Sequence, residues 1–337
     1  MNAYDELLAR LKDIDLVGQI GGLLGWDQEV LMPPKAAALR AEQLSWISKT
    51  GHEKLTDPRI GELLEVLEQK DNLDEVQRGN IRLARDSYDK ATKLPTDFVA
   101  EMAMHKSKSQ ISWTRARAEN DFSIFRDDLA KMVEMSRKKA DYLGYDEVRY
   151  DALLDLYESG LTVSRVDPLF AGLRENVAPL VKKVMQSGTK PDMSWVHNNT
   201  WSKKGQEGLS QSISEAIGFD FNAGRRDAST HPFCGGPNPD DVRWTTRYDE
   251  KDPFGSLYGS MHETGHGLYE QGRPRHLDFQ PTGSANGLGV HESQSRLWEN
   301  QIGRSREFCE WALPIWKEHF PEQMKGVSAE DLWRSVN

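Results

Sequence analysis

The sequence has few cysteines and no excess of basic residues. Its 337 residues include two cysteines, Cys234 and Cys309, which lie far apart in the chain. Two cysteines do not make a disulfide framework, so the composition favours a reducing compartment. Lys and Arg number 43 against 53 Asp and Glu, and no basic stripe stands out. This balance argues against a nucleic-acid partner.

Long apolar runs are also missing from the sequence. No stretch approaches the roughly 18 residues that a membrane-spanning helix needs. The first residues show neither the basic region nor the apolar region of a secretory signal. Hydrophobic residues at 37% and charged residues at 28% are typical of a soluble globular protein. The sequence therefore predicts a cytoplasmic protein without a membrane partner.

Helical patterns dominate about the first two hundred residues. Leu7, Leu11 and Ile14 have helical spacing. Pro58 stands where a helix can begin, because a first-turn proline loses no hydrogen bond. A further helix carries an apolar stripe that is expected to pack in the core: Phe122, Phe125, Leu129, Met132 and Val133.

The pattern changes after residue 187. The segment 188–208 is less regular but holds two tryptophans, which predicts an ordered loop. Strand signals occur only between residues 225 and 248, where Val242, Trp244 and Thr246 alternate with more polar residues. The turn-rich segment 235–239 precedes this alternation. The sequence therefore predicts a mainly α fold with a small antiparallel β-hairpin.

A metal-binding motif, HExxH, follows the strand signals. It consists of His262, Glu263 and His266 with two intervening residues. Residues four apart lie on one face of a helix, so both imidazoles can reach one zinc ion. Glu263 can then take a proton from a water molecule on the metal. The helix is expected from about 252 to 272, and its four glycines, at 255, 259, 265 and 267, suggest close packing against an unidentified neighbour.

A catalytic zinc site needs three protein ligands and one open position. The candidates for the third ligand are Glu270, Asp278, Glu292 and Glu299. Glu270 would approach from a poor direction, whereas Asp278 stands on a loop and remains possible. Glu292 is favoured, because it lies on a second helix, expected from about 290 to 298, that can fold back across the first. Glu299 could instead hold a ligand imidazole.

The HExxH motif is typical of zinc peptidases, and hydrolysis of a peptide bond also needs a donor for the developing oxyanion. His231 and His291 are candidates, because histidine is one of the side chains that usually fill this role. A structural hydrogen bond is an equally good interpretation of either residue.

Four motifs occur together in a fixed order. They are HPF at 231–233, DxRxT at 241–245, HExxH at 262–266 and HES at 291–293. Together they resemble the carboxypeptidase Taq family, the M32 metallocarboxypeptidases, and the segments 25–34 and 150–154 are also similar to that family. The resemblance covers essentially the whole chain. HExxH alone is shared by many peptidases, whereas the set of four is specific.

The resemblance implies a mostly helical peptidase with a deep groove that removes single residues from peptide C-termini. It implies one divalent metal ion per chain, most readily Zn²⁺ with Co²⁺ or Mn²⁺ as alternatives, and a homodimer. On the matching positions, the metal ligands would be His262, His266 and Glu292, and Glu263 would be the catalytic base. The HPF and DxRxT segments would line the groove, where His231, Arg243 and His291 are candidate substrate contacts.

The sequence departs from the family near its end, because the family's further motifs IRxxAD and GxxQDxHW do not occur. The IRxxAD arginine is expected to hold the substrate carboxylate, and Arg243 is a fallback for that role. We expect one M32-like peptidase domain over 1–337, incomplete at its C-terminal end. It would comprise a helical part at 1–187 and a catalytic part at 188–337. Two alternatives are a zinc endo- or oligopeptidase and a non-catalytic metal-binding fragment.

Overall fold

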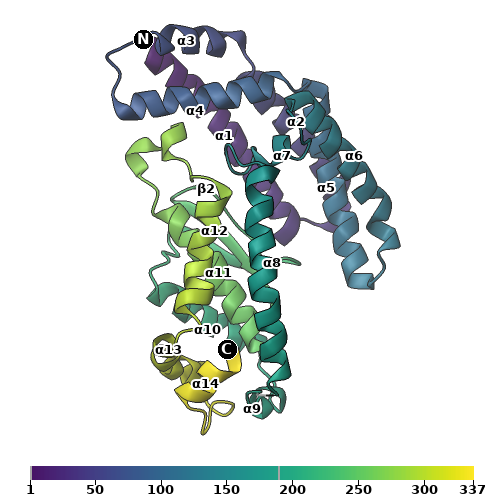
Figure 1. Ribbon diagram of the computed structural model, residues 1–337, viewed down its shortest axis with the longest axis vertical. Helices are drawn as coiled ribbons and strands as arrows, with labels where there is room; N and C mark the ends of the chain where they lie inside the picture. The colour runs from purple at the N-terminus through teal and green to yellow at the C-terminus, as the bar shows by residue number, and fades with distance from the viewer. Residues whose placement is uncertain (1, 189) are drawn as a thin grey trace. The chain divides into compact units, whose positions relative to one another are not determined.

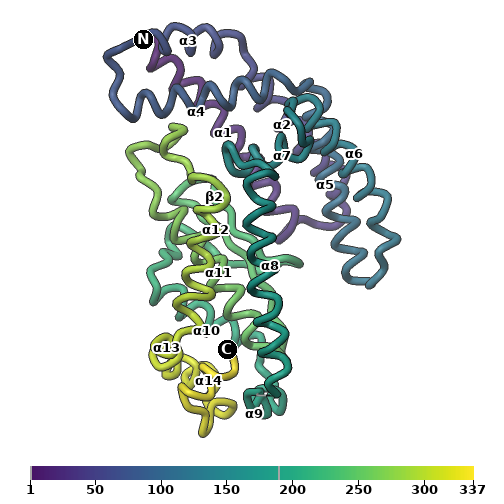
Figure 2. The backbone as a smooth tube through the Cα atoms, viewed as in Figure 1, coloured from purple at the N-terminus to yellow at the C-terminus, as the bar shows by residue number. Residues whose placement is uncertain are grey.

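The computed structural model describes residues 2–188 and 190–337 of the chain. Helices make up most of it, which confirms the predicted mainly α fold (Figures 1 and 2). Within the described residues, no helix combines the length and the apolar character needed to cross a membrane. The chain forms two compact units, and the predicted boundary at 187/188 stays a prediction. Unit 1 comprises Met1–Leu153, Gly235–Asp241 and Gly272–Ala285, and unit 2 comprises Leu154–Cys234, Val242–Gln271 and Asn286–Asn337.

Unit 1 is a helical assembly whose helices begin at recognisable caps. Asn2 accepts hydrogen bonds from two backbone amides of the first helix, and Asp57 accepts one at the start of the third. Its core contains Leu7 and Leu11, as their helical spacing predicts, together with Ile60. The main helices of this unit are α1 (Ala3–Val30), α2 (Ala37–Leu55), α3 (Pro58–Glu68), α4 (Glu75–Thr92), α5 (Thr96–Glu119) and α6 (Ser123–Leu143).

The apolar stripe predicted to pack in the core lies instead largely on the surface of α6. Phe122 is 60% exposed, Val133 42% and Leu129 37%. The helix packs against α5, and its buried residues are Met135, Ala140 and Leu143, none of which belongs to the stripe. The core interpretation of the stripe is therefore wrong, because apolar periodicity identifies a helical face without identifying what covers it.

Unit 2 is built around a cluster of aromatic side chains. Trp201 is fully buried, and its ring lies 5.8 Å from that of Trp316 and 5.0 Å from that of Phe320. The segment predicted as an ordered loop is therefore ordered within its described residues. The helices of this unit include α7 (Asp151–Leu154, at the boundary), α8 (Val163–Gln186), α9 (Ser194–His197), α10 (Lys203–Ala216), α11 (Pro253–Gln271), α12 (Leu288–Arg296), α13 (Arg306–His319) and α14 (Ala329–Val336).

One sheet precedes the predicted metal helix, with the strand order β1-β3-β2. Its strands are β1 (Gly224–Ala228), β2 (Cys234–Asn238) and β3 (Asp241–Thr246). A two-residue connection joins β2 to β3, as in an antiparallel hairpin. Two details differ from the prediction. The expected turn at 235–239 forms strand β2, where Pro237 is tolerated because the strand is at an edge, and β1 pairs with β3 in parallel.

Candidate metal centre

Helix α11 carries the HExxH motif and packs closely against α12. The helix runs from Pro253 to Gln271, in agreement with its predicted bounds. At Gly265 a Cβ atom would lie 2.7 Å from the carbonyl oxygen of Gln294 and 2.8 Å from the Cα atom of Ser295. A glycine is therefore needed inside the motif because the backbone of α12 occupies the space of a side chain. Helix α12 is the close neighbour that the sequence did not identify.

This contact brings three predicted metal ligands together. The Nε2 atom of His262 lies 3.6 Å from Oε2 of Glu292, and Nε2 of His266 lies 3.4 Å from the same oxygen. One ligand atom from each of the three residues lies within 4.8 Å of the other two. Two imidazoles and a carboxylate at this spacing match the donor set of a catalytic zinc site. These residues therefore fit one divalent cation.

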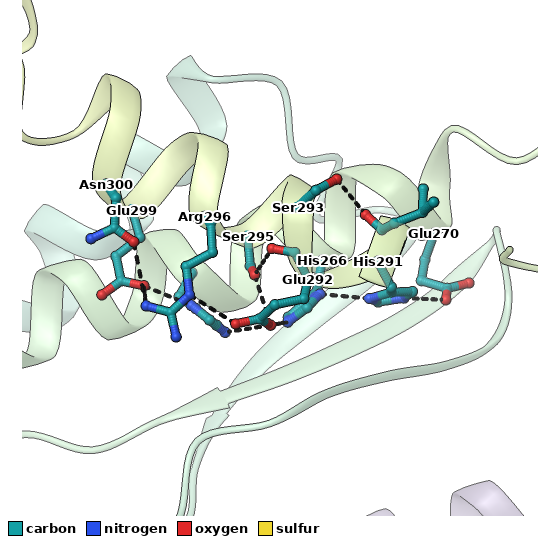
Figure 3. A network of polar contacts seen from close by, with 11 residues as sticks. His266, Glu270, His291, Glu292, Ser293, Ser295, Arg296, Glu299 and Asn300 are labelled. Carbon is teal, nitrogen blue, oxygen red and sulfur yellow. Dashed lines mark hydrogen bonds and ion pairs between the residues drawn. The ribbon is translucent and has the colours of Figure 1, made fainter. Parts of the chain in front are cut away.

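The remaining polar atom of each ligand contacts another side chain, as Figure 3 shows for His266 and Glu292. Nδ1 of His262 lies 2.8 Å from the carboxylate of Glu299, and Nδ1 of His266 lies 2.6 Å from Nδ1 of His291. The other carboxylate oxygen of Glu292, Oε1, accepts a hydrogen bond from Nε of Arg296 at 2.8 Å. Such contacts fix the rotamers of the three ligands and leave one atom of each directed at the same point.

Glu299 reaches His262 from a π-helical turn. The π-helix η4 (Leu297–Ile302) directly continues α12, and the amide of Gly303 donates to the carbonyl of Trp298, five residues earlier. A π-turn is wider than an α-turn and often occurs at functional sites. It changes the angular position of the residues that follow α12, and Glu299 accordingly contacts the imidazole of His262. The sequence predicted only a regular helix through 298.

Burial and neighbouring carboxylates perturb the acid–base properties of this centre. Burial, with the negative charges of Glu292 and Glu299, raises the pKa of Glu263 to about 8. Burial, with the nearby imidazoles, lowers the pKa of His266 to about 4. The pKa of Glu292 is lowered, because hydrogen bonds from Arg296 and its other neighbours outweigh partial burial. In the metal-free chain, His266 is therefore neutral at pH 7 and can offer a lone pair to a cation.

The other predicted site residues come from the sheet region and from the helix that carries Glu292. Arg243 stands on β3 and His231 on the connection between β1 and β2. His291 has both ring nitrogens engaged, because Nε2 contacts the carboxylate of Glu270 at 2.8 Å. Glu270, an alternative ligand, is thus paired with an imidazole. Asp278, another alternative, belongs to unit 1, whereas the three clustered ligands belong to unit 2.

Two contributors were missed by the sequence reasoning. Arg296 could have been found, because it follows Glu292 by four residues on a helix, a spacing that favours ion pairs. Glu158 accepts a hydrogen bond from the amide of Gly289 at 2.9 Å, at the start of α12. A Cβ atom at Gly287 would lie 2.9 Å from the same carboxylate. No local pattern signals Glu158, which is 131 residues away from the glycine it contacts.

Two histidines and one glutamate on two packed helices, with a buried glutamate beside the first histidine, define a metallopeptidase-type centre. The comparisons with known proteins agree. A sequence model of the carboxypeptidase Taq (M32) metallopeptidase family matches residues 6–337. The chain belongs to this family, which confirms the resemblance inferred from the four motifs.

The chain is similar to several named carboxypeptidases. It is 38% identical over 336 residues to carboxypeptidase 1 of Bacillus subtilis, a match that covers 98% of this chain and 66% of the relative. It is 37% identical over 349 residues to thermostable carboxypeptidase 1 of Thermus thermophilus, covering 99% of this chain and 68% of the relative. The chain therefore spans about two thirds of the length of these relatives.

Solved structures show the same fold. The M32 carboxypeptidase from Deinococcus radiodurans superimposes with a TM-score of 0.89 at 36% identity, covering 100% of this chain and 67% of that structure. Metallocarboxypeptidase 1 of Trypanosoma cruzi gives a TM-score of 0.86 at 32% identity, covering 99% of this chain and 67% of that structure.

Proposed function

We propose that this protein is a metal-dependent carboxypeptidase that removes residues from the C-termini of peptides. The observation that carries the proposal is the convergence of His262 Nε2, His266 Nε2 and a Glu292 oxygen within 4.8 Å of one another. Family membership and the names of the relatives support the same activity. We propose His262, His266 and Glu292 as the ligands of one divalent ion, with Zn²⁺ favoured by the donor set and Co²⁺ or Mn²⁺ as alternatives.

The chain's own residues supply the proton transfers of the proposed reaction. A divalent cation supplies positive charge that polarises the scissile carbonyl and acidifies a water molecule. Glu263 is adjacent to the first ligand and buried, so its carboxylate can accept the proton of the attacking water and pass it to the leaving amine. In the metal-free chain the pKa of Glu263 is raised to about 8, whereas the positive charge of a bound cation would lower it and favour the carboxylate that accepts the proton.

Substrate contacts belong to the strand region in this proposal. Arg243 on β3 is proposed to pair with the terminal carboxylate of the peptide, because guanidinium and carboxylate groups form strong paired hydrogen bonds. His231 is proposed as a donor to the developing oxyanion. Arg243→Ala should raise KM for a peptide with a free C-terminus more than it changes kcat.

A matched pair of variants tests the metal and base assignments. Glu263→Gln should keep the bound metal and lose roughly 10²- to 10⁴-fold in kcat, because the amide cannot accept the proton. Glu292→Ala should reduce the metal content itself. Metal analysis after dialysis and single-substrate kinetics distinguish the two effects. Near-normal hydrolysis by the Glu263 variant would show that the base is another residue.

A peptide and its C-terminally amidated twin test the substrate class. A carboxypeptidase should cleave only the peptide with a free carboxylate. Cleavage of both would indicate a zinc endo- or oligopeptidase, and stoichiometric metal without hydrolysis of either would indicate a non-catalytic metal-binding fragment. We also propose that the protein is cytoplasmic, because its cysteines are few, and that it is a homodimer, because the family resemblance implies one. Light scattering of the purified chain tests the dimer.

A further inference from the structure

The two histidines of the metal centre have different partners behind them. Nδ1 of His262 contacts a carboxylate directly, that of Glu299, at 2.8 Å. Nδ1 of His266 contacts a second imidazole, that of His291, at 2.6 Å. His291 in turn contacts the carboxylate of Glu270 through Nε2 at 2.8 Å. Each histidine ligand is thus backed by a carboxylate, directly for His262 and through a second imidazole for His266. Figure 3 shows His291 between His266 and Glu270.

Metal binding through Nε2 of His266, taken with these contacts, dictates which ring nitrogens carry protons. Nε2 of His266 faces Glu292 and the proposed metal position, so a metal-binding imidazole must keep its lone pair there and carry its proton on Nδ1. That proton can be donated only to a lone pair on Nδ1 of His291, whose own proton is then on Nε2. This proton meets the Glu270 carboxylate, so every hydrogen bond in the series has one donor and one acceptor.

The side chains of this series are mostly shielded from water. The side chains of His266 and Glu270 are each 12% exposed, and that of His291 is 19% exposed. The rings of His266 and His291 lie 4.5 Å apart, so a reorientation of one would displace the other. An unpartnered Nδ1–H in this mostly shielded position would lose its hydrogen bond and regain little from water.

We propose that His291 is a positioning residue, which holds His266 in its metal-binding tautomer and orientation, and that Glu270 holds His291. This inference rests on the proposed function, because it assigns His266 as a metal ligand. It gives His291 a role behind the ligand, in place of the oxyanion or substrate contact that the sequence suggested. Partners of this kind typically change metal affinity about 10- to 100-fold when removed.

Three variants of the purified chain test the proposal. His291→Phe keeps the ring volume but offers no acceptor to His266. His291→Asn places its side-chain oxygen near the position of Nδ1 and should rescue the hydrogen bond. Ser293→Ala is the matched control on the same helix, because the Ser293 hydroxyl donates to the carbonyl of Val290 and takes no part in the series.

The readouts are Co²⁺ affinity, measured in competition with a chelator, and the visible absorption spectrum of the Co²⁺-loaded chain. His291→Phe should weaken Co²⁺ binding by about 10- to 100-fold and alter the spectrum. His291→Asn should stay within a few-fold of wild type, and Ser293→Ala should not differ from it. Because neither readout requires peptide hydrolysis, an inactive chain would refute the proposed function without deciding this test.

Two results would overturn the proposal. One is a folded His291→Phe chain with wild-type Co²⁺ affinity and spectrum, and the other is an asparagine variant that binds no better than the phenylalanine variant. If circular dichroism shows that His291→Phe does not fold, Glu270→Gln and Glu270→Leu replace it. Glu270→Gln keeps an acceptor for His291, whereas Glu270→Leu does not. Equal Co²⁺ affinities of these two variants would therefore also refute the proposal.

Discussion

Replacing Gly265 by alanine should separate the helices that form the metal centre. The added methyl group would lie 2.7 Å from the carbonyl oxygen of Gln294 and 2.8 Å from the Cα atom of Ser295. An ordinary contact is about 3.5 Å or more, so α11 and α12 must move apart by several tenths of an ångström. Both contacted atoms belong to backbone, which cannot rotate away as a side chain can.

Two opposing terms determine the effect on stability. Alanine favours a helix by about 1 kcal/mol over glycine, whereas overpacking of a close contact costs about 1–3 kcal/mol. The net change for Gly265→Ala is therefore about 0–2 kcal/mol of destabilisation. Metal binding should suffer more, because the displaced segment follows Glu292 directly and ligand distances tolerate only about 0.2 Å. We expect the metal affinity to fall at least about tenfold.

Gly259→Ala is the matched control on the same helix. The nearest atom to a Cβ at Gly259 is Oγ1 of Thr246, at 4.0 Å, so the new methyl group meets no obstacle. This variant should gain up to about 1 kcal/mol and keep its metal affinity. Thermal unfolding of the metal-free chains and chelator competition provide the two measurements. The reasoning fails if Gly265→Ala is stabilised as much as Gly259→Ala and binds metal equally well.

Three further predictions concern the same centre. Because the pKa of Glu263 is raised to about 8 in the metal-free fold, the folded chain keeps a proton that the unfolded chain has lost. Its unfolding free energy should thus fall by roughly 1 kcal/mol from about pH 7 to pH 8, and urea unfolding of Glu263→Gln should show a smaller fall. Glu299→Ala should weaken zinc binding about 10- to 100-fold, since His262 loses its acceptor, whereas an unchanged affinity in chelator competition would exclude this role. Glu158→Ala should cost about 1 kcal/mol in thermal unfolding, because the amide of Gly289 loses its partner; an equal effect of Glu158→Gln would point to lost charge rather than a lost acceptor.

The predictions from sequence were accurate where one short segment contains the whole signal. Helix α11 has its predicted bounds, and the alternation at Val242, Trp244 and Thr246 corresponds to strand β3. They failed where the outcome depends on a distant neighbour. The stripe that begins at Phe122 is apolar and helical, yet its exposure depends on which helix lies beside α6.

The neighbourhood of the metal centre divides in the same way. The spacing of His262 and His266 follows from helix geometry alone, and the same is true of the pair formed by Glu292 and Arg296. The sequence also favoured Glu292 over Glu270, but whether Glu292 reaches the two histidines depends on how closely α12 packs against α11. The distance between the two helices depends on the backbone contact at Gly265, which joins residues about 30 positions apart in the chain.

The sequence by itself therefore identified the family to which the chain belongs, the three candidate ligands and the glutamate proposed as the base. Only the tertiary structure showed which groups hold these residues in place. They are the imidazole of His291 behind His266, the π-turn that carries Glu299 and the carboxylate of Glu158 at the start of α12. The physical reason is that local periodicity specifies which residues share a face. Which segment packs against that face depends on contacts between residues far apart in the chain, and no local pattern in the sequence records such contacts.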